Sequence, residues 1–419
     1  MELSNLLKTL GPGILFASTA IGVSHLVQST QAGANFGFTL IFAVILANLF
    51  KYPFFEFGSR YANATGKSII SGYRNLGIWA LVIYCVINVL SMFLVTYAVG
   101  YVTSSFLQNL FGISSAMLTV GIVFVVCIAV LISDNFKLLD GLIKVIGIVL
   151  LVSTLIAFFI ALAKGPQGSA PLMSFEDIDK DAYLLFLIPL MGWMPTAVDL
   201  STWNSLWTVE RIKQTGYHPK LKETLFDFNL GYIISALLAI CFLTLGAFIM
   251  FGTGKTFSPS GAKFSGEVIA LYTSTFGKWA YIVIAVSAFS IMFGTCVAVF
   301  DGYSRAMTST IRLLQGKEEH SAKNENSVRI QYRLVLILIS MGSFCLIWIF
   351  NDDPDGFKSL VNLATSVSFI IAPVIAIFNF ILVGKKHVGE KFVPPIWIRI
   401  TAWLGIIFLS AFTIFFIFK

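Results

Sequence analysis

Eleven stretches of about 20 mainly apolar residues follow one another along this 419-residue chain, and each is long enough to cross a lipid bilayer as a helix. The chain is 57% hydrophobic and only 12% charged, with a mean hydropathy of +0.86. A soluble domain carries roughly 25% charged residues. The sequence therefore predicts an all-α membrane protein with about eleven spans, at residues 10–32, 38–59, 77–107, 114–133, 138–163, 183–207, 228–252, 277–303, 329–350, 358–383 and 395–418.

The basic residues favour one orientation of these spans. With a cytoplasmic N-terminus, twenty Lys and Arg residues fall on the inner side and seven on the outer side, and Lys51 lies inside a span. Basic loops are retained in the cytoplasm, so we expect an inner-membrane protein with its N-terminus inside and its C-terminus outside. The acidic clusters at 176–181 and 352–355 then lie outside. The first apolar run lacks a basic leader, so no cleavable signal peptide is expected.

The composition also argues against several function classes. The net charge of +7 is assigned to inner loops near anionic lipid, not to a nucleic-acid surface. All five cysteines lie in apolar runs without paired spacing, so neither disulfides nor a thiolate metal cluster is indicated. Metalloprotease, serine-hydrolase, P-loop and dinucleotide motifs are missing from the sequence. We therefore expect no enzyme and no cofactor, and transport would draw on an ion gradient or the solute gradient.

The polar segments leave no room for a soluble domain. The longest of them, at 164–182, 208–227, 253–276 and 313–328, are predicted to be loops. Within the last, residues 317–326 are charged and lack apolar spacing, which is typical of a flexible linker.

Two spans carry interruptions near their middle. In the first span the run Gly22, Val23, Ser24 and His25 breaks the apolar pattern, and in the sixth span Pro189, Gly192 and Pro195 do so. Free backbone groups at that depth are tolerated beside a cavity. Breaks five spans apart predict an inverted repeat of five plus five helices, at about 10–163 and 183–383, with an extra helix at 395–418. The alternative is two packing kinks.

Around these breaks the chain resembles the Nramp family of proton-coupled divalent metal transporters, which have the LeuT-type fold. The resemblance covers essentially the whole chain. It is densest at Gly11–Gly13, Gln31–Ala34 and Leu46–Leu49, and it resumes at Met194–Pro195 and more faintly at Thr224–Asp227.

The chain departs from this family in the substrate site. Where the family has Asp-Pro-Gly-Asn in the first span, this chain has Gly22 at the carboxylate position and His25 at the amide position. The family's Met-Pro-His in the sixth span becomes Met194, Pro195 and Thr196, and its glutamine in the tenth span falls near Thr365. The third span contains no acidic residue, so the family's proton-relay carboxylate is also missing. A dication in a low dielectric needs compensating charge, which these changes remove.

The candidate solute-binding residues follow from the two breaks and the resemblance. His25 could contact a solute or a proton, since imidazole titrates near neutral pH, or it could make a structural hydrogen bond that closes the break. Met191 and Trp193 could form the wall of the site or simply pack. The predicted set is Gly22, Ser24, His25, Met191, Trp193, Met194, Thr196 and Thr365.

The candidate coupling or gating residues are the ionisable groups within the spans. Asp199 is an intramembrane acid, a type that is often functional, although it could instead be bonded within its half-helix to Ser201 or Thr202. Lys51 could snorkel inward or act as the gating partner of a carboxylate. Glu56 lies roughly 140° around the helix from Lys51.

Two i,i+4 ion pairs are expected at the inner ends of spans. Glu56 can reach Arg60, and Asp301 can reach Arg305. Either pair would be a structural contact.

Three functions remain open from sequence. The first is a secondary transporter of a small solute, such as an organic acid, an amide or an amino-acid-like molecule, with the solute, membrane lipid and a co-transported proton or sodium ion as partners. The alternative is a divergent proton-coupled divalent metal transporter that uses His25, Met194 and Asp199. The third is a scaffold or sensor, against which the charged residues inside the spans argue.

Overall fold

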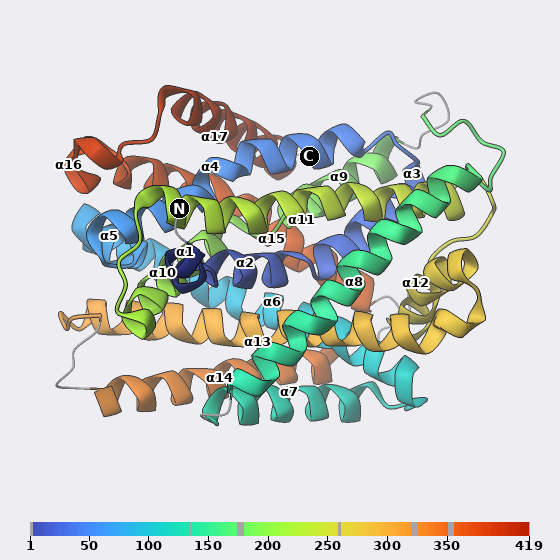
Figure 1. The fold of residues 1–419 in the computed structure, drawn as a ribbon, viewed down its shortest axis with the longest axis horizontal. Helices are drawn as coiled ribbons and strands as arrows, with labels where there is room; N and C mark the ends of the chain where they lie inside the picture. Colours follow the sequence, from blue (N-terminus) through green and yellow to red (C-terminus); the bar gives the residue numbers. More distant parts are fainter. Residues whose placement is uncertain are drawn as a thin grey trace.

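The computed structural model describes residues 3–133, 136–173, 180–258, 261–319, 325–350 and 356–418. Most of the long helices run along one axis of the molecule, and α8 crosses them obliquely (Figure 1). In chain order the elements are α1 (Leu3–Thr9), α2 (Pro12–Ala20), η1 (Ser24–Ser29), α3 (Thr30–Phe36), α4 (Ile41–Thr65), α5 (Ile69–Leu76), α6 (Ile78–Phe111), α7 (Ala116–Ile132), α8 (Phe136–Lys164), α9 (Lys180–Gly192), η2 (Val198–Leu200), α10 (Ser201–Thr215), α11 (Leu221–Ile249), α12 (Gly261–Phe276), η3 (Lys278–Ala280), α13 (Tyr281–Leu314), α14 (Glu325–Phe350), α15 (Gly356–Leu382), α16 (Lys385–Val388), η5 (Glu390–Phe392) and α17 (Ile396–Ile417).

The helices account for the predicted spans. Within the described ranges, seven of them are long and apolar enough to cross a membrane unaided: α4, α6, α11, α13, α14, α15 and α17. Helix α7 and the second half of α8 are apolar but shorter, and the first and sixth spans are each divided. The chain is therefore a multi-pass membrane protein.

The two predicted breaks are present. The first span runs as α2, a bend at Ile21 and Gly22, the π-helix η1 and then α3. The sixth span ends its first half, α9, at Gly192, and resumes as η2 and α10 from Val198. A π-helix lacks the usual i→i+4 bonds and is common at functional sites. Neither span is a continuous helix through its middle.

Several of the predicted loops are partly helical, and these predictions are corrected here. The segment 253–276 contains α12, whose buried Val268, Ile269 and Tyr272 face the bundle. Its apolar face is too narrow for a span, so hydropathy alone missed it. The supposed linker 317–326 contains Glu319, which is buried and accepts hydrogen bonds from Ser68 and Ser71. Residues 320–324 and the acidic cluster 352–355 lie outside the described residues, as do residues 176–179 of the other acidic cluster.

Close backbone contact between the first span and α11 fixes the position of the break. Helix α11 runs beside α2 and α3 (Figure 1). A Cβ atom at Gly33 would lie 1.9 Å from the carbonyl oxygen of Leu243, and one at Gly13 would lie 1.9 Å from that of Asp227. Small residues allow this approach, as is usual where membrane helices pack. The two helices therefore touch along both halves of the broken span.

This packing predicts an effect of a single methyl group. Gly33→Ala should lower the free energy of unfolding by about 1–3 kcal/mol, because the new Cβ overlaps the main chain of α11. Gly121→Ala in α7 is the matched control, since its Cβ would meet only Phe344 at 3.8 Å. Thermal unfolding of both variants in detergent measures the difference. Equal melting temperatures for the two variants would contradict the packing.

Candidate functional site

A small cavity lies between the two breaks. Spans 1 and 6 supply most of its wall, and α6 and α13 supply the rest. Its free volume for the centre of a water-sized sphere is ≈ 20 Å³, which leaves room for about one water molecule. None of the eleven lining residues is charged, and four of them offer a hydroxyl. They are Thr19, Val23, Ser24, Val95, Val99, Trp193, Thr196, Ala197, Leu200, Thr295 and Val299.

Three of the predicted site residues line this cavity. Ser24, Trp193 and Thr196 all contribute to its wall. The Ser24 hydroxyl lies 3.1 Å from the carbonyl oxygen of Pro195, so it joins the two breaks directly. The Trp193 indole donates a 2.9 Å hydrogen bond to Ser368 on α15, which fixes the ring at the cavity wall.

Thr295 occupies the space beside Gly22. A Cβ atom at Gly22 would lie 2.8 Å from Cγ2 and 3.0 Å from Oγ1 of Thr295. The Thr295 hydroxyl itself donates a 2.8 Å hydrogen bond to the carbonyl of Ser18. The position where the Nramp resemblance implies a carboxylate is therefore filled by a threonine from α13. Sequence reasoning missed Thr295, because nothing in its local pattern indicates this contact.

His25 lies behind the cavity wall and joins the first span to α11. Its Nε2 lies 2.8 Å from the carbonyl oxygen of Ser235, and its Nδ1 lies 2.7 Å from the Ser24 hydroxyl. Because a carbonyl only accepts, Nε2 carries the proton of the neutral ring. Nδ1 is then an acceptor that shares the single Ser24 hydroxyl hydrogen with the carbonyls of Ala20, at 2.7 Å, and Pro195. The ring is fully buried and is not among the cavity-lining residues. These contacts match the structural hydrogen bond foreseen for His25, and a direct role in transport stays a prediction.

Met191, Met194 and Thr365 are buried outside the cavity wall. The Thr365 hydroxyl donates to carbonyls of its own helix, 2.8 Å from that of Val361. The Thr365 main chain instead packs on the break, because a Cβ at Gly192 would lie 2.1 Å from its carbonyl oxygen. Thr365 therefore packs its main chain against the end of α9.

Lys51 extends from α4 into the break of the sixth span. Its ammonium donates to the carbonyl oxygens of Met191 at 2.6 Å, Gly192 at 2.8 Å and Thr196 at 3.3 Å. The side chain is 1% exposed, so of the two alternatives for Lys51 the structure does not show the one in which it snorkels. Asp199 interacts with Lys51 electrostatically. That Lys51 acts as the gating partner of a carboxylate stays a prediction.

Asp199 lies on η2, at the start of the second half of the sixth span. It is buried, and its carboxylate accepts a 3.4 Å hydrogen bond from the Tyr303 hydroxyl of α13. The Thr202 hydroxyl bonds the main-chain carbonyl of Asp199, at 2.9 Å, and the Ser201 hydroxyl accepts from Asn379. The expected bonds from Ser201 and Thr202 to the carboxylate are therefore absent among the described contacts.

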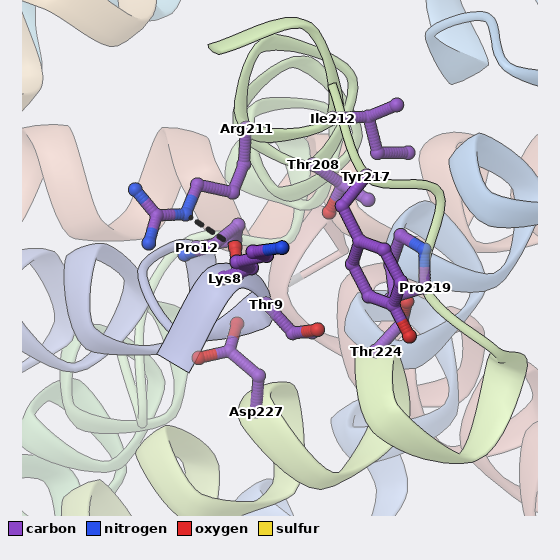
Figure 2. Close-up of a pocket in the computed structure, with 10 residues that line it drawn as sticks. All are labelled: Lys8, Thr9, Pro12, Thr208, Arg211, Ile212, Tyr217, Pro219, Thr224 and Asp227. Carbon is purple, nitrogen blue, oxygen red and sulfur yellow. Dashed lines mark hydrogen bonds between the residues drawn. The ribbon is translucent and has the colours of Figure 1, made fainter. Parts of the chain in front are cut away.

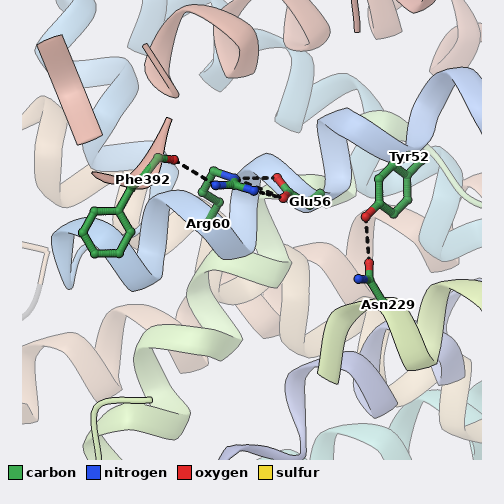
Figure 3. A network of polar contacts seen from close by, with 5 residues as sticks. All are labelled: Tyr52, Glu56, Arg60, Asn229 and Phe392. Atoms are coloured by element: carbon green, nitrogen blue, oxygen red, sulfur yellow. Dashed lines mark hydrogen bonds and ion pairs between the residues drawn. The ribbon is translucent and has the colours of Figure 1, made fainter. Parts of the chain in front are cut away.

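The two predicted i,i+4 ion pairs are both confirmed. Glu56 and Arg60 form a fully buried pair, and Arg60 also donates 2.9 Å to the carbonyl of Phe392 (Figure 3). Arg305 pairs with Asp301 at 2.8 Å. Through the Arg60 bond to Phe392, the first pair connects α4 to the segment before α17, which is a structural role.

A carboxylate caps the N-terminal end of α2, far from the break. Asp227 of α11 accepts hydrogen bonds from the main-chain N–H groups of Gly11, at 3.0 Å, and Gly13, at 2.6 Å. Arg211 donates 2.8 Å to the carbonyl of Lys8 beside it (Figure 2). A carboxylate at a helix N-terminus satisfies free N–H groups and the helix dipole. The sequence placed Asp227 at the entrance to the seventh span without revealing this contact.

The geometry offers little for a metal ion. Within the described ranges, no group of three or more His, Cys, Asp and Glu residues could hold one. His25 is turned toward Ser235 and Asp199 toward Tyr303. The cavity wall instead consists of hydroxyls, an indole and apolar side chains.

Comparison with known proteins places these features in context. The family model described as natural resistance-associated macrophage protein-like (Nramp) matches residues 13–419. An uncharacterised protein of Pasteurella multocida is 36% identical over 415 residues, covering 97% of this chain and 91% of that protein. The divalent metal cation transporter MntH of Levilactobacillus brevis is 23% identical over 429 residues, covering 97% of this chain and 87% of that one.

Two solved structures have the same fold. The manganese transporter of Eremococcus coleocola, in complex with an aromatic bis-isothiourea compound, superposes with a TM-score of 0.73 at 14% identity, covering 97% of this chain and 85% of that one. MhsT in complex with L-phenylalanine superposes with a TM-score of 0.62 at 12% identity, covering 99% and 98%. The predicted LeuT-type fold is therefore confirmed.

The buried ion pair of Glu56 and Arg60 predicts that its loss destabilises the protein. Glu56→Gln should lower the free energy of unfolding by about 3–5 kcal/mol, because it leaves the buried Arg60 without its counter-charge. Glu390→Gln is the control, since Glu390 and Lys385 form an exposed pair worth at most about 1 kcal/mol. Chemical or thermal unfolding of both variants measures the contrast. A Glu56→Gln variant as stable as Glu390→Gln would refute the assignment.

Proposed function

Because this chain belongs to the Nramp family, whose members are transporters and not enzymes, we propose that it is a secondary transporter of a small solute other than Mn²⁺ or Fe²⁺. The solute would be an organic acid, an amide or an amino-acid-like molecule. The observation that carries this proposal is the uncharged wall of the cavity between the breaks. A dication there would lack compensating charge.

The groups around the cavity suit polar organic solutes. The hydroxyls of Ser24 and Thr196 can bond carbonyl, amide or carboxylate groups. The π-helix η1 begins at Ser24 and η2 begins at Val198, and main-chain N–H groups at such starts favour anionic groups. The Trp193 ring and the valines of α6 would contact the apolar part of the solute.

The size of the cavity supports a mechanism of alternating access. A free volume of ≈ 20 Å³ is too small for such a solute, so the walls must separate to admit it. The parts that can move are the half-helices on either side of the breaks.

We further propose the predicted topology. The N-terminus would lie in the cytoplasm and the C-terminus outside the inner membrane, and the two repeats would span residues 10–163 and 183–383.

The alternative function is proton-coupled transport of a divalent metal. Relatives at 22–23% identity are named divalent metal cation transporters, which favours it. It would require His25, Met194 and Asp199 to turn toward one point. The present hydrogen bonds of His25 and Asp199 lead away from such an arrangement.

Ligand binding separates the two functions. Isothermal titration of the purified protein with Mn²⁺ should show no binding tighter than about millimolar. A thermal-shift screen of small amides, amino acids and carboxylates should give a stabilising ligand whose effect Ser24→Ala and Thr196→Val abolish. Ser133→Ala, exposed at the far end of α7, should keep it.

A variant with the missing carboxylate restored should gain Mn²⁺ binding. Gly22→Asp combined with Thr295→Ala, which clears the space for the carboxylate, should bind Mn²⁺ more tightly than the unmodified protein does. Micromolar binding by the unmodified protein that disappears in His25→Ala or Met194→Ala would establish the metal function instead.

Coupling to protons is proposed to run through groups on the broken helices. Asp199→Asn and His25→Ala should each abolish accumulation of the solute driven by a pH gradient. The measurement is uptake into proteoliposomes with and without that gradient. If both variants still concentrate the solute, facilitated downhill transport becomes the better account.

A further inference from the structure

The Lys51 ammonium lies inside a ring of main-chain oxygens. The three carbonyls that it contacts belong to Met191 and Gly192, at the end of α9, and to Thr196, in the following loop. The last carbonyls of a helix have no partner within that helix. In a membrane interior such groups need a donor from elsewhere. Lys51 supplies this donor from α4, across 140 residues of sequence.

This arrangement has the chemistry of a cation site. The C-terminal end of a helix carries a partial charge of roughly −0.5, and its carbonyls attract cations. Unwound carbonyls of broken helices bind small cations in other transporters of this general design. An ammonium has three N–H donors, and here each of three carbonyls lies within 3.3 Å of the nitrogen. The occupant of the site is therefore a cation that the chain itself carries.

A simple capping role would not call for a charge. A serine or asparagine could donate to one free carbonyl without bringing a formal charge into the membrane interior, where charge is unfavourable. The chain instead has lysine, and Asp199 interacts with it electrostatically from the other half of the same break. Asp199 lies at the start of the second half of this span, and Lys51 reaches the end of the first half from α4.

We propose that Lys51 is a built-in cation, which permanently occupies a monovalent-cation site in the sixth span. The carbonyls of Met191, Gly192 and Thr196 form this site. The protein would then need no dissolved sodium or potassium ion at this place. The inference does not depend on which solute is carried, and its test measures stability without any transport substrate.

The test removes the tethered charge and offers free cations in its place. Lys51→Met is one atom shorter than lysine and uncharged, so it fills most of the side chain's space but leaves the three carbonyls without a cation. Melting temperatures of the purified variant are measured in choline chloride, sodium chloride, potassium chloride and methylammonium chloride at equal ionic strength. The matched control is Lys67→Met, which removes an equal charge from an exposed position after α4. The unmodified protein is measured in the same series.

In choline chloride, Lys51→Met should melt about 5 °C or more below the unmodified protein. Sodium, potassium or methylammonium should raise its melting temperature in a saturable way, since a ligand that binds only the folded state stabilises it. The unmodified protein and Lys67→Met should not respond. A Lys51→Met variant that melts equally in all four salts would overturn the proposal, because capping alone predicts no cation response.

A second arm of the experiment covers the case in which Lys51→Met folds poorly. Purification is then repeated with methylammonium present throughout, and Lys51→Gln is carried through the same series. Recovery of folded protein that depends on a small cation supports the built-in cation. Failure of both variants to fold in every salt overturns it, since a vacant cation site should be refillable.

Discussion

The structure depends on one constraint, which is that every main-chain polar group within a membrane needs a partner. Two spans give up part of their own helical hydrogen bonds, and the protein provides partners from distant segments. Lys51 supplies three hydrogen bonds to the break in the sixth span. Ser24 and His25 join the first break to Pro195 and to α11. The helices can be interrupted beside the cavity because these side chains provide hydrogen-bond partners for the main-chain groups there.

The remainder of the fold holds the breaks in place. The first span packs on α11 at van der Waals distance through glycines, and Asp227 of α11 caps its N-terminal end. The buried pair of Glu56 and Arg60 secures α4, the helix that carries Lys51, to the segment before α17. The broken spans are thus attached to rigid neighbours at their ends and are irregular only near the cavity.

The sequence predicted the spans and both breaks, because apolar length and the Gly and Pro positions are local signals. It also predicted the pairs of Glu56 with Arg60 and Asp301 with Arg305, which follow from i+4 spacing. It could not predict that Lys51 reaches Met191, that Thr295 fills the space at Gly22, or that Asp227 caps α2. Each of these contacts joins segments more than one hundred residues apart, and a single sequence holds no record of such proximity. Helix α12 was missed for another reason, since it is amphipathic and too polar for a span.

The central claim is that the cavity between the breaks receives a small organic solute and no divalent metal. The most direct measurement is an experimental structure of the protein crystallised with Mn²⁺ and with the organic solute that stabilises it most, using anomalous scattering to locate manganese. The account predicts solute density bounded by Ser24, Trp193 and Thr196, and no manganese peak between the broken helices. A manganese peak there, with Met194 and His25 turned toward it, would contradict the account.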